Sequence, residues 1–231
     1  MANANVAVAN FRTAKRIHRS VLAASERRLL IWMAERTPRF INSDHLSALG
    51  AAGIALAGAA FWASRSSRVW LLIVIIGLTL NWLGDSLDGT LARVRDQQRP
   101  RYGFYLDHVL DAFGLTVLLG GLALSGYIST LVALGLLAAY LLLMVETALA
   151  TYTLGEFRMS FACFGPTELR IVLAVGALAL WNDPRVTVTV LGTQYRLFDV
   201  GGAVAIAGML AVVIVSSIQH AATLYRAEPL P

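Results

Sequence analysis

The 231-residue sequence is apolar: 57% of its residues are hydrophobic, 14% are charged, and the formal net charge is +5. Soluble domains carry about 25% charged residues, so these charges are too few to cover a water-facing surface, which argues against a soluble enzyme. A chain this apolar does not remain disordered, and its single cysteine, Cys163, excludes an intramolecular disulfide or a cysteine-rich zinc site. An integral membrane protein remains.

The first 44 residues are basic and precede every long apolar run. We expect a cytoplasmic or interfacial segment with no signal peptide, because the first apolar run follows only after this basic stretch. Residues 21–36 would form an interfacial amphipathic helix, although a solubilising basic tail explains the pattern equally well. The apolar side of that helix would carry Leu22, Leu29, Leu30 and Met33.

Six apolar stretches approach the length of about 20 residues that a helix needs to cross a bilayer. They cover residues 46–63, 69–84, 103–124, 128–149, 171–181 and 200–218, with the fifth extended upstream by residues 167–170. Their richness in Gly and Ala, without alternation of apolar and polar residues, indicates helices and not barrel strands. The sequence therefore predicts an all-α integral membrane protein, a six-transmembrane-helix bundle over residues 45–226 with a short tail at 227–231.

The basic residues indicate the orientation of this bundle. Fifteen of the 19 Lys and Arg residues fall on the side that holds both termini, and four fall on the other side. By the positive-inside rule, both termini and the ends of the second, fourth and sixth helices face the cytoplasm. Topology and anionic lipid explain the positive charge, so no nucleic-acid partner is expected.

Four of the eight aspartates stand in one short region, on two predicted helices that follow one another: Asp85, Asp88, Asp107 and Asp111. If the second helix continues past the interface, helical periodicity places the first two on one face with three further residues, Gly89, Ala92 and Arg93. Gly103 shares a face of the third helix with the other two aspartates. A short basic connection makes the helices antiparallel neighbours, so the four carboxylates can converge at the cytoplasmic end.

Converging carboxylates repel one another unless a cation lies between them. Oxygen ligands suit Mg²⁺ or Mn²⁺, and four carboxylates favour a pair of ions. Gly89 and Ala92 leave room for a ligand, and Arg93 suits a phosphate, so the pattern describes a diphosphate site. The alternative, solvated interfacial carboxylates, explains any one aspartate but not the full pattern.

The pattern D-x-x-D-G-x-x-A-R-x9-G-x3-D-x3-D, over residues 85–111, resembles the signature of the CDP-alcohol phosphotransferases, integral membrane enzymes of phospholipid synthesis. The resemblance implies transfer of a substituted phosphate group from a CDP-linked donor to an alcohol, with release of CMP. It implies that Asp85, Asp88 and Asp107 bind two divalent ions, and that Asp111 joins them and serves as general base. It assigns the CDP group to Gly89, Ala92, Arg93 and Gly103.

The same resemblance covers the start of the first helix, where the family tends to have a Thr-Pro-Asn-x-Leu-Thr-like segment. Residues 42–47 read Asn-Ser-Asp-His-Leu-Ser, so Ser43 and Asp44 replace the Pro and the Asn. The resemblance places Asp44 in the nucleotide pocket and implies a homodimer. Whether the lipid is the donor, as CDP-diacylglycerol, or the acceptor of a CDP-linked head group stays open.

Residues 164–170, Phe-Gly-Pro-Thr-Glu-Leu-Arg, faintly resemble a Gly-Pro-x-Glu segment of the choline and ethanolamine branch of this family. Arg158, Glu168 and Arg170 are candidates for binding the acceptor, although such arginines also serve as membrane anchors. Glu146, inside the fourth predicted helix, is either functional or hydrogen-bonded to a neighbouring helix. His108 is expected to pack and not to ligate.

Two other functions fit part of the pattern. A divalent-cation transporter would place carboxylates near mid-membrane, often within inverted repeats, and a non-catalytic lipid-binding protein would need no Asp111. Because the aspartates cluster at one interface and no repeat is visible, the sequence favours the transferase.

Overall fold

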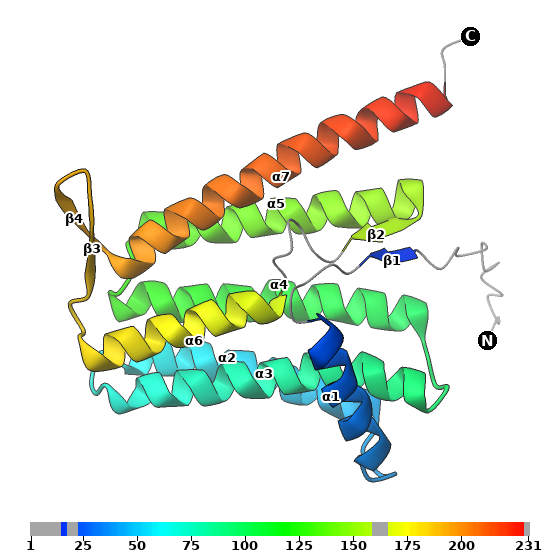
Figure 1. Cartoon of the computed structure of the whole chain (residues 1–231), viewed down its shortest axis with the longest axis horizontal. Coiled ribbons are helices and arrows are strands. Elements are labelled where there is room, and N and C mark those ends of the chain that lie inside the picture. The colour runs from blue at the N-terminus through cyan, green and yellow to red at the C-terminus, as the bar shows by residue number, and fades with distance from the viewer. Residues whose placement is uncertain (1–14, 18–22, 159–165, 229–231) are drawn as a thin grey trace, which may run out of the picture.

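The computed structural model describes residues 15–17, 23–158 and 166–228. This part of the chain is almost entirely helical (Figure 1). The helices are α1 (Ala23–Arg36), α2 (Ser43–Ala63), α3 (Val69–Val94), α4 (Pro100–Ser125), α5 (Thr130–Leu154), α6 (Pro166–Asn182) and α7 (Leu197–Ala227). The strands are β1 (Lys15–Ile17), β2 (Glu156–Arg158), β3 (Thr187–Val190) and β4 (Thr193–Arg196).

Five helices of the described part are long and apolar enough to cross a membrane: α2, α3, α4, α5 and α7. These five helices fit the integral membrane protein expected from composition. Each of the six apolar stretches forms a helix, but α6 has only 17 residues and is not among the five candidate spans.

The helices extend beyond the apolar stretches that predicted them. α3 continues ten residues past the predicted end at 84, to Val94, so the whole Asp85–Arg93 segment is helical. α4 begins at Pro100, whose fixed φ suits a first helical turn. α7 begins at Leu197 and reaches Ala227, so it extends beyond the predicted 200–218 stretch at both ends.

The strands were not foreseen by the sequence analysis. β3 and β4 form an antiparallel hairpin in which Val190 pairs with Thr193. Its two-residue turn places Leu191 and Gly192 at φ values of 50° and 81°, the positive values that a type I′ hairpin turn requires. β1 and β2 pair in parallel and bring residues 15–17 beside residues 156–158.

α2, α3 and α4 pack closely because small residues face one another. A Cβ on Gly84 of α3 would collide with the backbone of Gly50 in α2, and a Cβ on Gly121 of α4 would collide with the Gly58 carbonyl of α2. Small residues at such contacts let membrane helices approach closely. The fully buried side chains of this core include Phe61, Leu71, Val74 and Leu122.

The remaining helices cover this core unequally. α7 packs mainly on α5 and diverges from the other helices toward its C-terminal end (Figure 1). α1 lies against α3, with Leu30 and Ala34 buried in a cluster with Leu87. Leu29, expected on the same apolar side as Leu30, is exposed, as is Trp32. Leu22, also expected there, lies outside the described residues.

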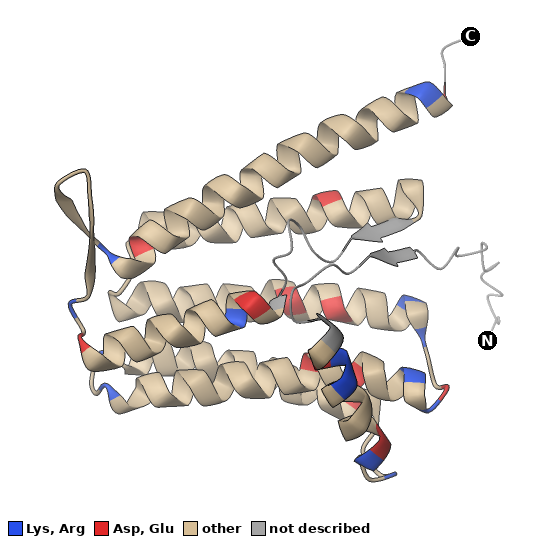
Figure 2. Cartoon of the chain, in the orientation of Figure 1, with Lys and Arg blue, Asp and Glu red and all other residues tan. Residues whose placement is uncertain are grey.

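The charged residues gather at two levels of the bundle. Figure 2 shows an uncharged stretch of long helices between charges at one end and a mixed acidic and basic region near α1. Asp85 and Asp88 lie in the C-terminal half of α3, and Asp107 and Asp111 lie in the N-terminal half of α4.

Candidate functional site

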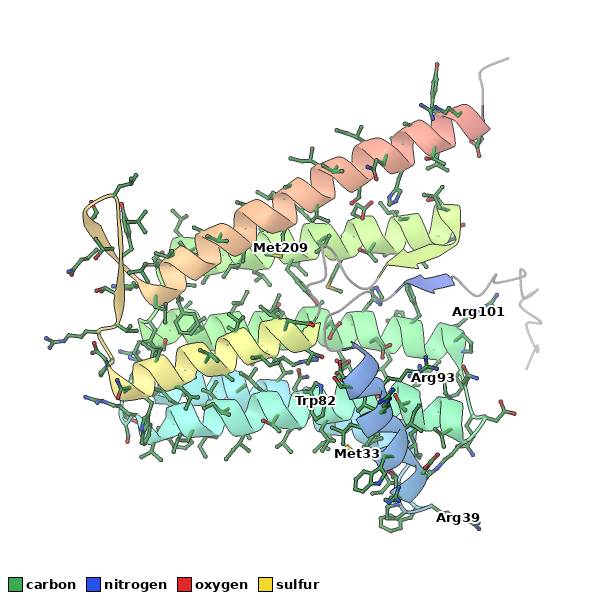
Figure 3. The ribbon with its side chains drawn as sticks, viewed as in Figure 1. Met33, Arg39, Trp82, Arg93, Arg101 and Met209 are labelled. Carbon is green, nitrogen blue, oxygen red and sulfur yellow. The ribbon has the colours of Figure 1, made fainter. Side chains whose placement is uncertain are left out.

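The motif occupies two consecutive helices that are joined by a short connection. Asp85 and Asp88 lie on α3, Asp107 and Asp111 lie on α4, and residues 95–99 connect the helices. Arg93 and Arg101 lie toward the end of the bundle where α3 and α4 are joined (Figure 3). The two helices run antiparallel, as the short connection predicted, but they are not packed neighbours, because each packs mainly on α2.

Asp88 is buried and hydrogen-bonded to the start of α2. The Ser47 hydroxyl donates to Asp88 Oδ2 at 2.6 Å, and the Gly89 backbone N–H donates to the other carboxylate oxygen. The Ser43 hydroxyl donates to the main-chain oxygen of Asp88 at 3.0 Å. The first turns of α2 thus fix the rotamer and the backbone of this aspartate.

Asp85 contacts α6 instead. Arg170 Nη2 lies 2.6 Å from Asp85 Oδ2, and Arg170 Nε donates to Asn81 Oδ1 at 2.7 Å. Asn81 in turn donates from Nδ2 to the Gly50 carbonyl at 3.0 Å. The Arg170 guanidinium, whose side chain is only 14% exposed, is therefore held by two residues one turn apart on α3.

Asp111 is the exposed member of the motif. Its carboxyl lies within electrostatic range of Asp85, Asp88 and Asp107, and of the Arg170 guanidinium. The four motif carboxylates therefore share one electrostatic environment, to which Arg170 adds a positive charge. The Tyr140 hydroxyl, from α5, is within electrostatic range of Asp111, Asp85 and Arg170.

The donor set suits a hard cation, because all four side chains offer carboxylate oxygens. In residues 15–17, 23–158 and 166–228, however, no three His, Cys, Asp or Glu side chains form a ready-made ion site. Asp88 already accepts hydrogen bonds from Ser47 and Gly89, and Asp85 is paired with Arg170. The carboxylate oxygens of the motif are suitable ligands for Mg²⁺ or Mn²⁺. In this structure, however, the side chains are arranged so that Arg170 neutralises part of their charge.

A cavity of about 300 Å³ opens beside the motif, between the start of α2 and the joined ends of α3 and α4. Every residue that the sequence assigned to the nucleotide lines it: Asp44, Gly89, Ala92, Arg93 and Gly103. Asp88 and Asp107 line it as well, and Thr151 of α5 adds a further wall. Asp85 and Asp111 are not among the lining residues.

Two glycines of the cavity wall have no packing role. A Cβ on Gly89 would meet only Arg93 Nη1, at 3.5 Å, and a Cβ on Gly103 would meet nothing within 4 Å. Both residues are helical, so backbone conformation does not demand glycine either. What the two glycines provide is space in the cavity.

Charged groups line the mouth of the cavity. Asp44 forms an ion pair with Arg99, and the Arg99 guanidinium lies 4.3 Å from the centre of the Tyr102 ring. Arg93 is exposed and donates to Thr90 Oγ1 at 3.0 Å. The negative charge of Asp44 is therefore balanced by a cation from the α3–α4 connection.

The other candidates from the sequence are scattered. Glu168 is half-buried in the first turn of α6, and Arg158 belongs to β2, with its side chain outside the described part. Glu146 Oε1 lies 2.6 Å from His220 Nδ1 of α7, so it contacts a neighbouring helix. His108 Nδ1 lies 2.9 Å from the Phe104 carbonyl oxygen and its ring packs on Phe104, which fits the packing role expected of it.

Sequence reasoning missed four residues of this region: Ser47, Asn81, Arg99 and Tyr140. The spacing of Asn81 and Asp85, and that of Ser43 and Ser47, is one helical turn and could have drawn attention to the first two. Arg99 and Tyr140 stand in no recognisable pattern, and only the folded arrangement brings them to the motif.

Comparison with known proteins identifies the family to which this chain belongs. No curated protein gives a significant match to the chain. Residues 46–219 match the CDP-alcohol phosphatidyltransferase family, a range that runs from the start of α2 into α7 and includes the whole motif. The chain therefore belongs to the CDP-alcohol phosphatidyltransferase family.

Proposed function

We propose that this protein transfers a substituted phosphate group from a CDP-linked donor to an alcohol hydroxyl and releases CMP. Family membership points to phosphatidyl transfer from a CDP-alcohol. The observation that carries the more specific proposal is the cavity, which combines Asp88 and Asp107 with Arg93 and with two glycines that packing does not require.

The cavity suits the nucleotide half of the donor. Its volume of about 300 Å³ lies at the lower end of the range for small-molecule sites. Gly89, Ala92 and Gly103 leave a surface without bulky side chains on which the nucleotide can lie. Arg93 offers a guanidinium to a phosphate, and Asp44 with Arg99 forms the rim.

The motif aspartates would hold two Mg²⁺ or Mn²⁺ ions: Asp85, Asp88, Asp107 and Asp111. Bound divalent ions neutralise a diphosphate and stabilise the phosphate of the leaving group. Arg170 supplies the positive charge beside Asp85 in the present structure. Asp85 directly follows Gly84, whose close contact with Gly50 holds α3 on α2, so a rigid part of the molecule would carry the ions.

In the proposed reaction, the acceptor hydroxyl oxygen forms a bond to the phosphorus that carries the transferred group. The bond from that phosphorus to the bridging oxygen of the diphosphate breaks, and CMP leaves with the electron pair. Asp111 takes the hydroxyl proton. Its electrostatic contact with the other motif carboxylates and with Arg170 supports this role. Arg170, with Glu168 and Arg158, would face the acceptor.

The membrane arrangement follows from the same proposal. α6 would be a sixth, shorter crossing, and α1 would lie at the cytoplasmic interface with Leu29 and Trp32 toward lipid. Both termini and the site would face the cytoplasm, as the distribution of basic residues indicates. At least one substrate is a lipid, and the active form would be a homodimer of the residue 45–226 domain.

The test is to supply the purified full-length protein in lipid nanodiscs with radiolabelled CDP-diacylglycerol, CDP-choline or CDP-ethanolamine, a panel of alcohols and Mg²⁺. We expect CMP release with one class of donor, dependent on the acceptor and abolished by Asp111→Asn. Asp183→Asn is the matched control, because Asp183 is exposed and distant in sequence, and its contact with the Arg185 N–H needs only an acceptor oxygen.

Two results would contradict the proposal. Undiminished CMP release by Asp111→Asn would remove the assigned base. Failure of every donor and acceptor pair, together with Mg²⁺ flux into liposomes that hold the protein, would make the chain a transporter despite its family.

A further inference from the structure

Glu26 of α1 lies outside the proposed chemistry and joins three helices. Trp82 Nε1 of α3 donates to Glu26 Oε1 at 2.7 Å, and Thr167 Oγ1 of α6 donates to the same oxygen at 2.8 Å. Ser86 Oγ of α3 makes a longer contact with it at 3.5 Å. Figure 3 shows Trp82 at the place where α1 passes α3.

These contacts run beside those of the candidate site. On α3, Trp82 and Ser86 directly follow Asn81 and Asp85, the two residues that hold Arg170. On α6, Thr167 precedes Arg170 by three residues, so the two side chains lie on one face of the helix. Glu26 therefore joins the first turn of α6 to the same two turns of α3 that Arg170 contacts.

We propose that Glu26 is a positioning residue that holds the first turn of α6, so that Arg170 stays beside Asp85 and Asp111 on the acceptor side of the site. The proposal rests on the proposed function, in which Arg170 binds the acceptor. A long side chain reaches two partners only if its backbone is placed correctly, and misplacement by about 1 Å can cost about a hundredfold in rate. Glu26 fixes that backbone through Thr167, without contact to either substrate.

Burial of Leu30 and Ala34 docks α1 on α3 independently of Glu26. The Glu26 carboxylate is therefore not needed merely to attach the helix. Its particular effect is the link from α1 to α6, which Thr167 makes, and this link can be removed on its own.

The experiment compares the full-length protein in nanodiscs with Glu26→Ala and Glu35→Ala. Glu35 is the matched control, because it lies exposed on the same helix and its removal changes the net charge equally. For Glu26→Ala we expect the KM for the acceptor alcohol to rise about tenfold, with the KM for the CDP-linked donor unchanged. Glu26→Gln should keep the acceptor KM close to that of the unaltered protein, because an amide oxygen still accepts hydrogen bonds from Trp82 and Thr167.

Thr167→Val separates positioning from general stability. This change removes the α1–α6 hydrogen bond and leaves the α1–α3 contacts in place. We expect it to raise the acceptor KM as Glu26→Ala does, and the double variant to be no worse than Glu26→Ala, since both changes break one link.

Distinct outcomes separate the two proposals. If the unaltered protein releases no CMP with any donor, the proposed function fails and the positioning role fails with it. If the unaltered protein is active but Glu26→Ala and Thr167→Val behave like Glu35→Ala, only the positioning role is overturned. A fall in kcat or unfolding temperature with both KM values unchanged would also overturn it, because that result describes a structural residue.

Discussion

The two sides of the helical bundle are held together differently. Within an apolar 18-residue stretch of each helix, the buried share is 44% in α2, 33% in α3 and 28% in α4. The corresponding share is 11% in both α5 and α7. The first three helices approach through glycines and carry the motif, while the other two present apolar side chains outward and share the Glu146–His220 contact. Rigidity is thus concentrated where four carboxylates from two helices must be placed relative to one another.

Among the changes that test this comparison, Asp88→Asn is expected to have the largest effect, because it keeps the shape of the side chain and removes its charge. The amide oxygen can still accept from the Gly89 N–H, and the Ser47 hydroxyl can accept from the amide nitrogen while it donates to the Ser43 carbonyl. We therefore expect the unfolding temperature to stay nearly unchanged. CMP release should fall about a thousandfold, since electrostatic stabilisation of developing charge contributes several kcal/mol. Parallel thermal unfolding and CMP-release assays check both expectations, and activity above a tenth of the original would contradict them.

Gly84→Ala should act on stability instead. The new methyl group would meet the backbone of Gly50, which cannot move aside as a flexible side chain can, so α2 and α3 must separate. Overpacking of this kind costs about 1–3 kcal/mol of unfolding free energy, measurable by SDS titration in mixed micelles.

The matched change on the other side of the bundle is Gly208→Ala in α7, where a Cβ meets nothing within 4 Å. This variant should be as stable as the original or slightly more stable, because alanine favours a helix over glycine. Equal destabilisation by both variants would contradict the proposed difference in packing between α2, α3 and α4 on one side and α5 and α7 on the other.

Gly89→Ala should weaken donor binding without weakening the fold. The methyl group would stand in the cavity, where its nearest neighbour is Arg93 Nη1 at 3.5 Å. We expect the donor KM to rise about tenfold, from loss of space against the ligand, and stability to rise by up to about 1 kcal/mol. Gly103→Ala should change the donor KM and the stability in the same way. An unchanged donor KM in both variants would show that the ligand does not use this wall.

Helical periodicity placed Gly89, Ala92 and Arg93 on one face of α3, and the family resemblance assigned them, with Asp44 and Gly103, to the nucleotide. All five line the cavity. Hydropathy predicted where the six apolar stretches form helices, but not how far α3 and α7 continue, because polar residues at a membrane boundary remain helical without an apolar signal. The contacts of Arg170 with Asp85 and of Glu26 with Thr167 join residues 85 and 141 positions apart. Such pairs depend on how helices pack, which no local pattern records.

The smallest effect is expected from His220→Gln and Glu146→Gln, at the contact between α5 and α7. The side chains are 19% and 11% exposed, yet polar contacts between membrane helices contribute only about 0.6 kcal/mol on average. Glu146 stands about 120° around α5 from Tyr140, so it faces α7 and not the motif. Each single change, and the double change, should therefore lower the unfolding free energy by less than about 1 kcal/mol and leave CMP release within about twofold. A tenfold loss of activity would show that α7 takes part in placing the site, and the carboxylates would then depend on both sides of the bundle.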